Sequence, residues 1–257
     1  MLARVGAAAV VVFAALPLWY MVVLSLDPDP AGVGAGLWPQ RISLDNYRAL
    51  ASPAFDFYPA LQNSVLLSVG TTAASLLIAV PAAHALSRLY VPARQQVLAA
   101  MLAFAFFPQI ILGVPLSFIF SSIGWLDRLG GIGLAQMSFT VPLAVWFLAH
   151  AFRQVPEEVV EAARLDGAGT RQVILGVILP SARAGVAGTT ALVFVASWND
   201  FLFSSILNRT SRSETLSVML AELPTVGFLG GQMAAGVLMC APVALVLYAL
   251  LQWLARR

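Results

Sequence analysis

The sequence predicts an all-α membrane protein, and two observations carry that prediction: the composition and the length of the apolar runs. Of the 257 residues, 60% are hydrophobic and only 10% are charged, whereas soluble domains carry about 25% charged residues. Several uncharged runs also reach the roughly 20 residues that a helix needs to cross a bilayer. A water-soluble domain could not bury this much apolar surface, so the membrane class follows before any motif is considered.

The uncharged runs predict about six transmembrane helices within a single transmembrane domain, residues 1–257. The expected spans are residues 5–26, 58–86, 96–123, 130–152, 184–207 and 229–254. The first run follows Arg4, as the apolar part of a signal peptide would follow a basic residue. It continues through Trp19 and Tyr20, however, and is longer than a typical signal sequence. We therefore expect a retained helix that these aromatic residues anchor at the interface.

The arginines predict the orientation, because loops rich in positive charge stay in the cytoplasm. The richer set of loops holds Arg4, Arg88, Arg94, Arg153, Arg164, Arg171, Arg183, Arg256 and Arg257. The opposite set holds Arg41, Arg48, Arg128, Arg209 and Arg212. This bias places both termini and the loop of residues 154–182 in the cytoplasm. The net charge of +2 is too small for a nucleic-acid-binding surface.

The loop of residues 154–182, between the fourth and fifth spans, is the longest charge-rich interval, and two short helices are expected in it. Pro156 suits the first turn of a helix, where a missing N–H costs nothing. Three glutamates follow, at the positive end of the helix dipole; they are Glu157, Glu158 and Glu161. Gly167 can take the left-handed conformation that ends a helix.

A second short helix should follow, with Thr170 as its N-cap and Pro180 at its end. Apolar side chains on the two helices could fit a cleft on a partner protein. They are Val159, Val160, Ile174 and Val177. The residues alone support two interpretations equally: a docking element, or an ordinary connecting loop that carries a surface helix.

The same loop contains a motif at fixed offsets, which resembles the EAA loop of the membrane subunits of binding-protein-dependent ABC importers. The matching residues are Glu161, Ala162, Ala163, Asp166, Gly167, Ala168, Leu179 and Pro180. In that family the loop couples the transport channel to a separate ATPase, and the resemblance implies this role here. The chain departs from the family pattern at Ile174, where phenylalanine is usual, and at Leu175-Gly176, where a basic pair is common.

Other segments resemble, in kind and order, the carbohydrate-importing branch of this family. They are Leu44-Asp45-Asn46-Tyr47, Asn63-Ser64, Phe107-Pro108-Gln109 and Ser197-Trp198-Asn199-Asp200. The resemblance implies a sugar permease in a bacterial cytoplasmic membrane. Its partners would be a second homologous permease subunit, two ATPase subunits and an extracytoplasmic solute-binding protein. The chain lacks the Gly-x-x-x-x-Gly-Lys-[Ser/Thr] phosphate loop, so we expect ATP and Mg on the ATPase subunits. We expect no catalytic residue, metal or cofactor on this chain.

Asp200 is the one carboxylate that interrupts an apolar span, about 25 Å along a helix from Arg183. An ionisable group inside a membrane is costly unless it faces protein or water. Asp200 could therefore lie in the solute path with Trp198 and Asn199, or could hydrogen-bond to a neighbouring helix. The amides Gln109 and Asn63 are further candidates for the path, although amides in membrane helices often bond across helices.

Three alternative functions remain open at this point. An intramembrane serine protease would need a histidine base at the depth of its serine, but both histidines lie near span ends. An ion-coupled secondary transporter should show internal repeats and more acidic groups at mid-membrane. An ABC permease for a non-sugar solute such as glycerol phosphate would share the loop motif.

Overall fold

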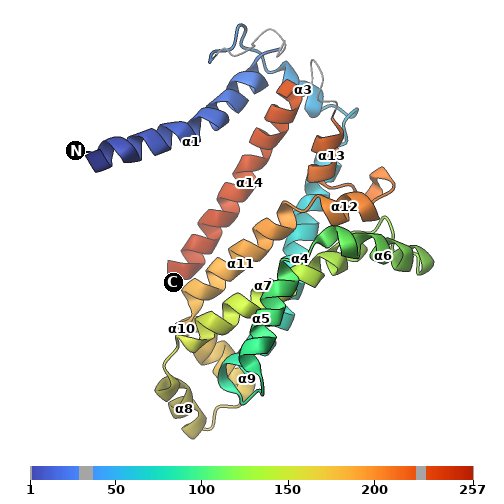
Figure 1. The fold of residues 1–257 in the computed structure, drawn as a ribbon. Coiled ribbons are helices and arrows are strands. Elements are labelled where there is room, and N and C mark those ends of the chain that lie inside the picture. The colour runs from blue at the N-terminus through green and yellow to red at the C-terminus, as the bar shows by residue number, and fades with distance from the viewer. Residues whose placement is uncertain (1, 29–36, 224–229, 257) are drawn as a thin grey trace. The chain divides into compact units, whose positions relative to one another are not determined.

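The computed structural model describes residues 2–28, 37–223 and 230–256, and every regular element in these ranges is a helix (Figure 1). The predicted all-α class is confirmed. The chain divides into two compact units. One comprises Met1–Leu61 with Val218–Val246, and the other comprises Gln62–Ser217 with Leu247–Arg257. Each unit is described by itself below.

Two helices in the described part of the chain are long and apolar enough to cross a membrane: α4 (Phe57–Arg88) and α7 (Leu129–Arg153). They coincide with the predicted spans 58–86 and 130–152. Up to two more spans are described if each of two bent helix pairs counts as one. Shorter apolar stretches lie in α1 (Leu2–Leu26) and α14 (Gly230–Arg256). The described helices thus give two to four candidate spans, and the full set of six stays a prediction.

The bent pairs have local causes. Helix α5 (Arg94–Ala105) meets α6 (Gln109–Ser122) at an angle of 79°, and Pro108 is the N-cap of α6. Proline has no N–H to continue the helical bonding, so the predicted span 96–123 is broken. The second pair, residues 170–181 with α11 (Arg183–Trp198), meets at 87°.

In the first unit, helix α3 (Asp45–Leu50) caps the C-terminal end of α1. The last carbonyls of a helix have no partner within it. The buried Asn46 donates to three carbonyls there: Asp27 O at 2.8 Å, Ser25 O at 3.1 Å and Leu24 O at 3.5 Å. Tyr47 adds a bond to the Ser25 hydroxyl at 2.8 Å. The segment Asp45-Asn46-Tyr47 therefore holds the C-terminal end of α1 in place through hydrogen bonds.

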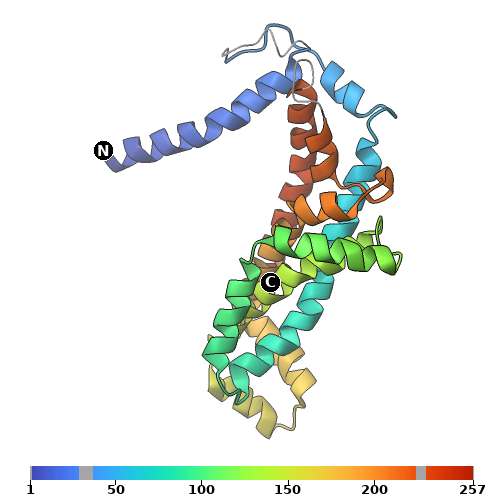
Figure 2. The same cartoon turned by 45° about the vertical axis from the view of Figure 1, so that its right-hand side comes forward.

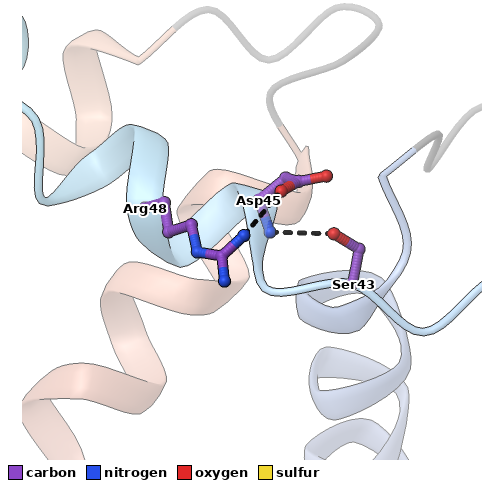
Figure 3. Close-up of polar contacts among 3 residues, drawn as sticks. All are labelled: Ser43, Asp45 and Arg48. Atoms are coloured by element: carbon purple, nitrogen blue, oxygen red, sulfur yellow. Dashed lines mark hydrogen bonds and ion pairs between the residues drawn. The ribbon is translucent and has the colours of Figure 1, made fainter.

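Asp45 and Arg48 of α3 have exposed side chains, and Figure 3 shows the contacts that they make. The Ser43 hydroxyl accepts from the Asp45 backbone N–H at 3.0 Å, and Arg48 forms an ion pair with Asp45 at 3.5 Å. Exposed pairs of this kind add little stability. The three residues fix the first turn of α3, whereas Asn46 on the buried side binds the end of α1.

In the second unit, small residues let α4, α7 and α11 pack closely, as is common between membrane helices. Ala79, Ala83, Ala144 and Ala149 are fully buried, and a side chain at Gly185 of α11 would collide with Ala151 of α7. The same core extends to the polar end of the unit, where Figures 1 and 2 show α8 (Glu157–Leu165) and α9 (Thr170–Val173). This arrangement fixes the predicted coupling segment on the bundle.

Candidate functional site

Helix α8 ends in a turn at Gly167, and this turn accounts for the spacing of Ala163, Gly167 and Ala168 in the loop motif. Gly167 has a φ of +86°, as predicted. Its N–H donates to Arg164 O, and the N–H of Ala168 donates to Ala163 O, both at 3.0 Å. These two bonds form the Schellman motif. Ala163 and Ala168 then pack against the same hydrophobic core, so the motif residues define a helix with a fixed end.

The structure corrects three details of the predicted second helix and its neighbour. Pro156 is the N-cap of α8 and precedes its first turn. Thr170 is the first residue of α9; the N-cap is Gly169, whose N–H donates to the Gln172 side chain at 2.8 Å. The Gln172 side chain thus satisfies the backbone N–H of the N-cap residue, as the N3 residue of a capping box does.

Pro180 does not end the second helix. The helical path continues from α9 through a π-helical stretch, Ile174–Ile178, into α10 (Leu179–Ser181). Proline cannot donate to the carbonyl four residues before it, and a wider π turn is a common local adjustment in such a helix. The chain turns only at Ala182, where α11 begins.

The two sides of α8 differ sharply in exposure. Val160 is 1% exposed and lies in the core of the second unit, so the prediction that it faces a partner is wrong. Val159 is 47% exposed and Leu165 is 89% exposed. Sequence reasoning missed Leu165, although its place beside Asp166 in a polar loop was the available signal. The outward side of α8 therefore presents apolar side chains that the unit itself does not cover.

The charged groups of the outward side are also uncommitted. Glu161 and Ala162 of the motif are exposed, as are Asp166 and Arg164. Within the part of the chain that the structure describes, no carboxylate of α8 forms an ion pair. The carboxylates of α8 are thus available to cations of another molecule.

Arg88, the last residue of α4, anchors the start of the loop. Its Nη2 donates to Phe152 O and Val155 O, each at 2.5 Å. Phe152 lies in the last turn of α7, and Val155 directly precedes Pro156 of the loop. A cation suits the C-terminal end of a helix, where unpaired carbonyls collect. Arg88 thereby ties α4, α7 and the residue that precedes Pro156 together, which fixes the start of α8 to the helical bundle.

Asp200 lies in a buried polar network that joins α7 to the break between α11 and α12 (Leu202–Leu207). Its Oδ2 accepts from Gln136 Nε2 at 3.0 Å and from the backbone N–H and hydroxyl of Ser204 at 3.2 Å. Its Oδ1 accepts from the Phe203 N–H at 3.4 Å. Asp200 therefore caps α12 and bonds across helices, as the structural interpretation predicts.

Gln136 is the centre of this network, and sequence reasoning missed it. Its side chain is fully buried and also accepts from Ser197 Oγ at 2.5 Å. Its backbone carbonyl accepts from Thr140, which in turn bonds to Ser75 of α4 at 2.8 Å. A lone amide in an otherwise apolar helix was the signal that could have identified it.

The other candidates for the solute path differ in how far they are committed. Asn63 donates to Glu214 O at 2.9 Å, which holds the loop before α13 (Leu216–Glu222). Trp198 stacks on Phe194. Asn199 is exposed, and Gln109 is partly exposed at the start of α6. Among the described residues, neither Gln109 nor Asn63 hydrogen-bonds to Asp200, and the shared solute path of the five candidates stays a prediction.

Apolar helices of membrane-spanning length, with a polar segment packed against the end of the same core, define an integral membrane protein. Residues 71–257 match the family described as "Binding-protein-dependent transport system inner membrane component". This chain belongs to that family. Family membership confirms the resemblance on which the loop motif was interpreted, and it makes the chain a component of a transport system.

Two relatives and one solved structure extend this result. The chain is 31% identical to the trehalose/maltose transport system permease protein MalG of Thermococcus litoralis, over 94% of this chain and 88% of that protein. It is 34% identical to the trehalose transport system permease protein SugB of Mycobacterium tuberculosis, over 83% and 77% respectively. The fold resembles a chain of a bacterial ABC transporter involved in the import of alginate, with a TM-score of 0.77, 24% identity and coverage of 98% and 95%.

Proposed function

We propose that this chain is one transmembrane subunit of an ATP-driven importer that takes up a di- or oligosaccharide delivered by an external binding protein. The observation that carries the proposal is the coupling segment. Its helix is fixed to the bundle through Val160 and Arg88, and its outward side holds unpaired carboxylates and the exposed Leu165. A rigid element with an uncommitted surface can transmit a push from a soluble partner to the membrane helices.

The proposed topology has six spans with both termini in the cytoplasm of a bacterial cell. Helices α4 and α7 and the two bent pairs supply four spans, and α1 and α14 supply the outer two. The arginine distribution supports the orientation. Under this orientation α8 lies in the cytoplasm, beside two ATPase subunits that bind ATP and Mg.

The mechanism is alternating access. Closure of the ATPase subunits would move α8, and the Arg88 bonds and the Val160 contact would pass this movement to α4 and α7. A second, homologous permease subunit would supply the other wall of the pathway. Family membership supports drive by ATP over coupling to an ion gradient, because the family is defined by binding-protein-dependent transport.

A sugar is the proposed solute because the relatives named above transport trehalose and maltose, according to their names. A non-sugar solute such as glycerol phosphate is the alternative within the same family. In the solute path, Asn199 and Gln109 are the candidates whose side chains make no bond within the described chain. Asp200, Trp198 and Asn63 already contact other residues of the chain, so they would support the wall of the path without binding the solute themselves.

The first experiment is affinity purification of the tagged chain from its native membrane in a mild detergent, with the partners identified by mass. We expect a nucleotide-binding ATPase, a second permease and, with cross-linking, an external binding protein. Reconstituted together, they should hydrolyse ATP faster when the loaded binding protein is added. A chain that is recovered without an ATPase, even after cross-linking from α8, would contradict the proposal.

A further inference from the structure

An apolar groove of about 700 Å³ lies between α4 and the helical stretch that follows the coupling turn. Leu76, Leu77 and Val80 form its wall on α4, and Ile174, Leu175 and Leu179 form the opposite wall. Thr170 and Arg171 are the two lining residues with polar side chains. A volume of this size falls within the roughly 300–1,000 Å³ of small-molecule sites.

Side chains on both walls of this groove are exposed. Leu77 is 78% exposed and Leu175 is 52% exposed, although each lies beside residues of the buried core. A side chain at Gly176 would meet nothing within 4 Å. Leu175 lies on a segment that is fixed through the buried Val173 and Ile178, so this wall of the groove is held in place.

The charge at the groove selects the kind of molecule that fits it. Arg171 is exposed, and its guanidinium forms no ion pair among the described residues. An apolar channel beside an unpaired cation complements an amphiphile with an apolar tail and an anionic head. Near a membrane, that description fits a phospholipid, and basic pockets between membrane helices on the cytoplasmic side bind anionic head groups.

We propose that this groove holds one acyl chain of an anionic phospholipid, with the lipid phosphate bound by Arg171 and the Thr170 hydroxyl. The lipid would lie directly behind the coupling turn, between α4 and residues 170–179. The assignment to the inner leaflet rests on the proposed orientation, whereas the groove and its cation do not.

The proposal is tested by counting retained lipids on the purified chain, with whatever partners it carries, by native mass spectrometry. Palmitoyl-oleoyl phosphatidylglycerol is titrated against palmitoyl-oleoyl phosphatidylcholine. We expect one phosphatidylglycerol to bind preferentially and Arg171→Gln to weaken its binding by about fivefold, the effect of one arginine near an anionic surface. Leu175→Trp, which fills the groove, should weaken it comparably without removing a charge.

Matched variants separate this site from general effects. Arg183→Gln removes an exposed arginine of α11, and Val195→Trp enlarges an exposed apolar side chain of the same helix; neither residue lines the groove. Both should bind phosphatidylglycerol as the unchanged protein does. Inorganic phosphate should not displace the lipid, because it lacks the chain that the groove holds; displacement would reduce the site to a phosphate site and overturn the acyl-chain assignment.

Two other results would also overturn the proposal. Equal lipid retention by Arg171→Gln, Leu175→Trp and their controls would show that the groove does not hold the lipid. A photo-cross-linker at Leu175 that captures a second permease, and no lipid, would show that a protein covers this face. Neither result bears on transport, which is measured separately, so failure here is distinguishable from failure of the proposed function.

Discussion

Helix α8 and the Asp200 network differ in the surroundings of their carboxyl groups: those of α8 are exposed, whereas that of Asp200 is buried. On α8 the carboxylate of Glu161 is exposed and unpaired, and Leu165 is exposed beside it. Asp200 is 7% exposed, and both of its oxygens accept hydrogen bonds from the chain itself. Both regions carry family-type motifs, yet one motif completes the fold and the other leaves exposed side chains that form no ion pair within the described chain. Burial and hydrogen-bond partners separate these roles, whereas residue type does not.

The largest effect on stability is expected from a substitution in the buried Asp200 network. Gln136→Leu removes one donor to Asp200 and the acceptor of Ser197 Oγ. A buried polar group that loses its hydrogen-bond partner costs about 1–3 kcal/mol. We expect this loss in the free energy of unfolding, measured by denaturant titration in detergent micelles.

The double variant Gln136→Leu, Asp200→Leu provides the control for this prediction. Replacing both partners of a buried bond is less costly than orphaning one of them. The double variant should therefore lose less stability than the sum of the two single variants, a coupling that a double-mutant cycle measures. Additive losses would mean that the Gln136–Asp200 bond does not hold the network together.

An intermediate loss of stability is expected from a substitution at Gly167, in the turn between α8 and α9. Gly167→Val places a branched side chain at a φ of +86°, where an ordinary residue costs about 1–2 kcal/mol. The end of α8 should loosen, and ATP hydrolysis by the reconstituted complex should lose its stimulation by the loaded binding protein. Gly167→Asn is the matched control, since asparagine tolerates this conformation far better.

Binding measurements decide how the Gly167 result is interpreted. Gly167→Val should still co-purify with the ATPase, because Glu161 and Leu165 are unchanged. Normal stimulation of ATP hydrolysis in this variant would show that the fixed turn is not needed for coupling. Loss in both the valine and the asparagine variants would point to a contact made by the glycine itself.

The sequence predicted much of this arrangement through local rules. Helix α8, the left-handed Gly167 and the long helices α4 and α7 follow from caps, dipoles and the length of apolar runs. These signals act within a few residues of one another, so they survive in the folded chain. The Schellman bonds of Ala163 and Ala168 then explain why the motif has its spacing.

Other features depended on long-range packing and could not be predicted. Val160 was expected to face a partner, because a 3.6-residue period groups it with a face but does not say which face meets the core. Gln136 was not considered, since its partners Ser197 and Asp200 lie more than 60 residues away. Membrane helices increase this difficulty, because lipid-facing and core-facing sides are both apolar.

The smallest effect on stability, and the sharpest test of the outward side, is expected from Leu165→Ser. Leu165 is 89% exposed, and substitutions at such positions usually change stability by less than about 0.5 kcal/mol. An exposed apolar anchor that fills a partner's cleft can nevertheless contribute about 1–2 kcal/mol or more to binding. We expect unchanged unfolding and roughly tenfold weaker binding of the ATPase, measured by titration of the purified subunits.

Val160→Ser, five residues earlier on α8, is the control that completes the comparison. Val160 is fully packed in the core of the second unit, so this substitution should lower stability by about 1–3 kcal/mol, the cost of burying a polar hydroxyl. Once folded, that variant should bind the ATPase with nearly normal affinity, because its outward side is intact. If Leu165→Ser and Val160→Ser weakened binding equally, the two sides of α8 would not have separate roles, and α8 would dock as a whole or not at all.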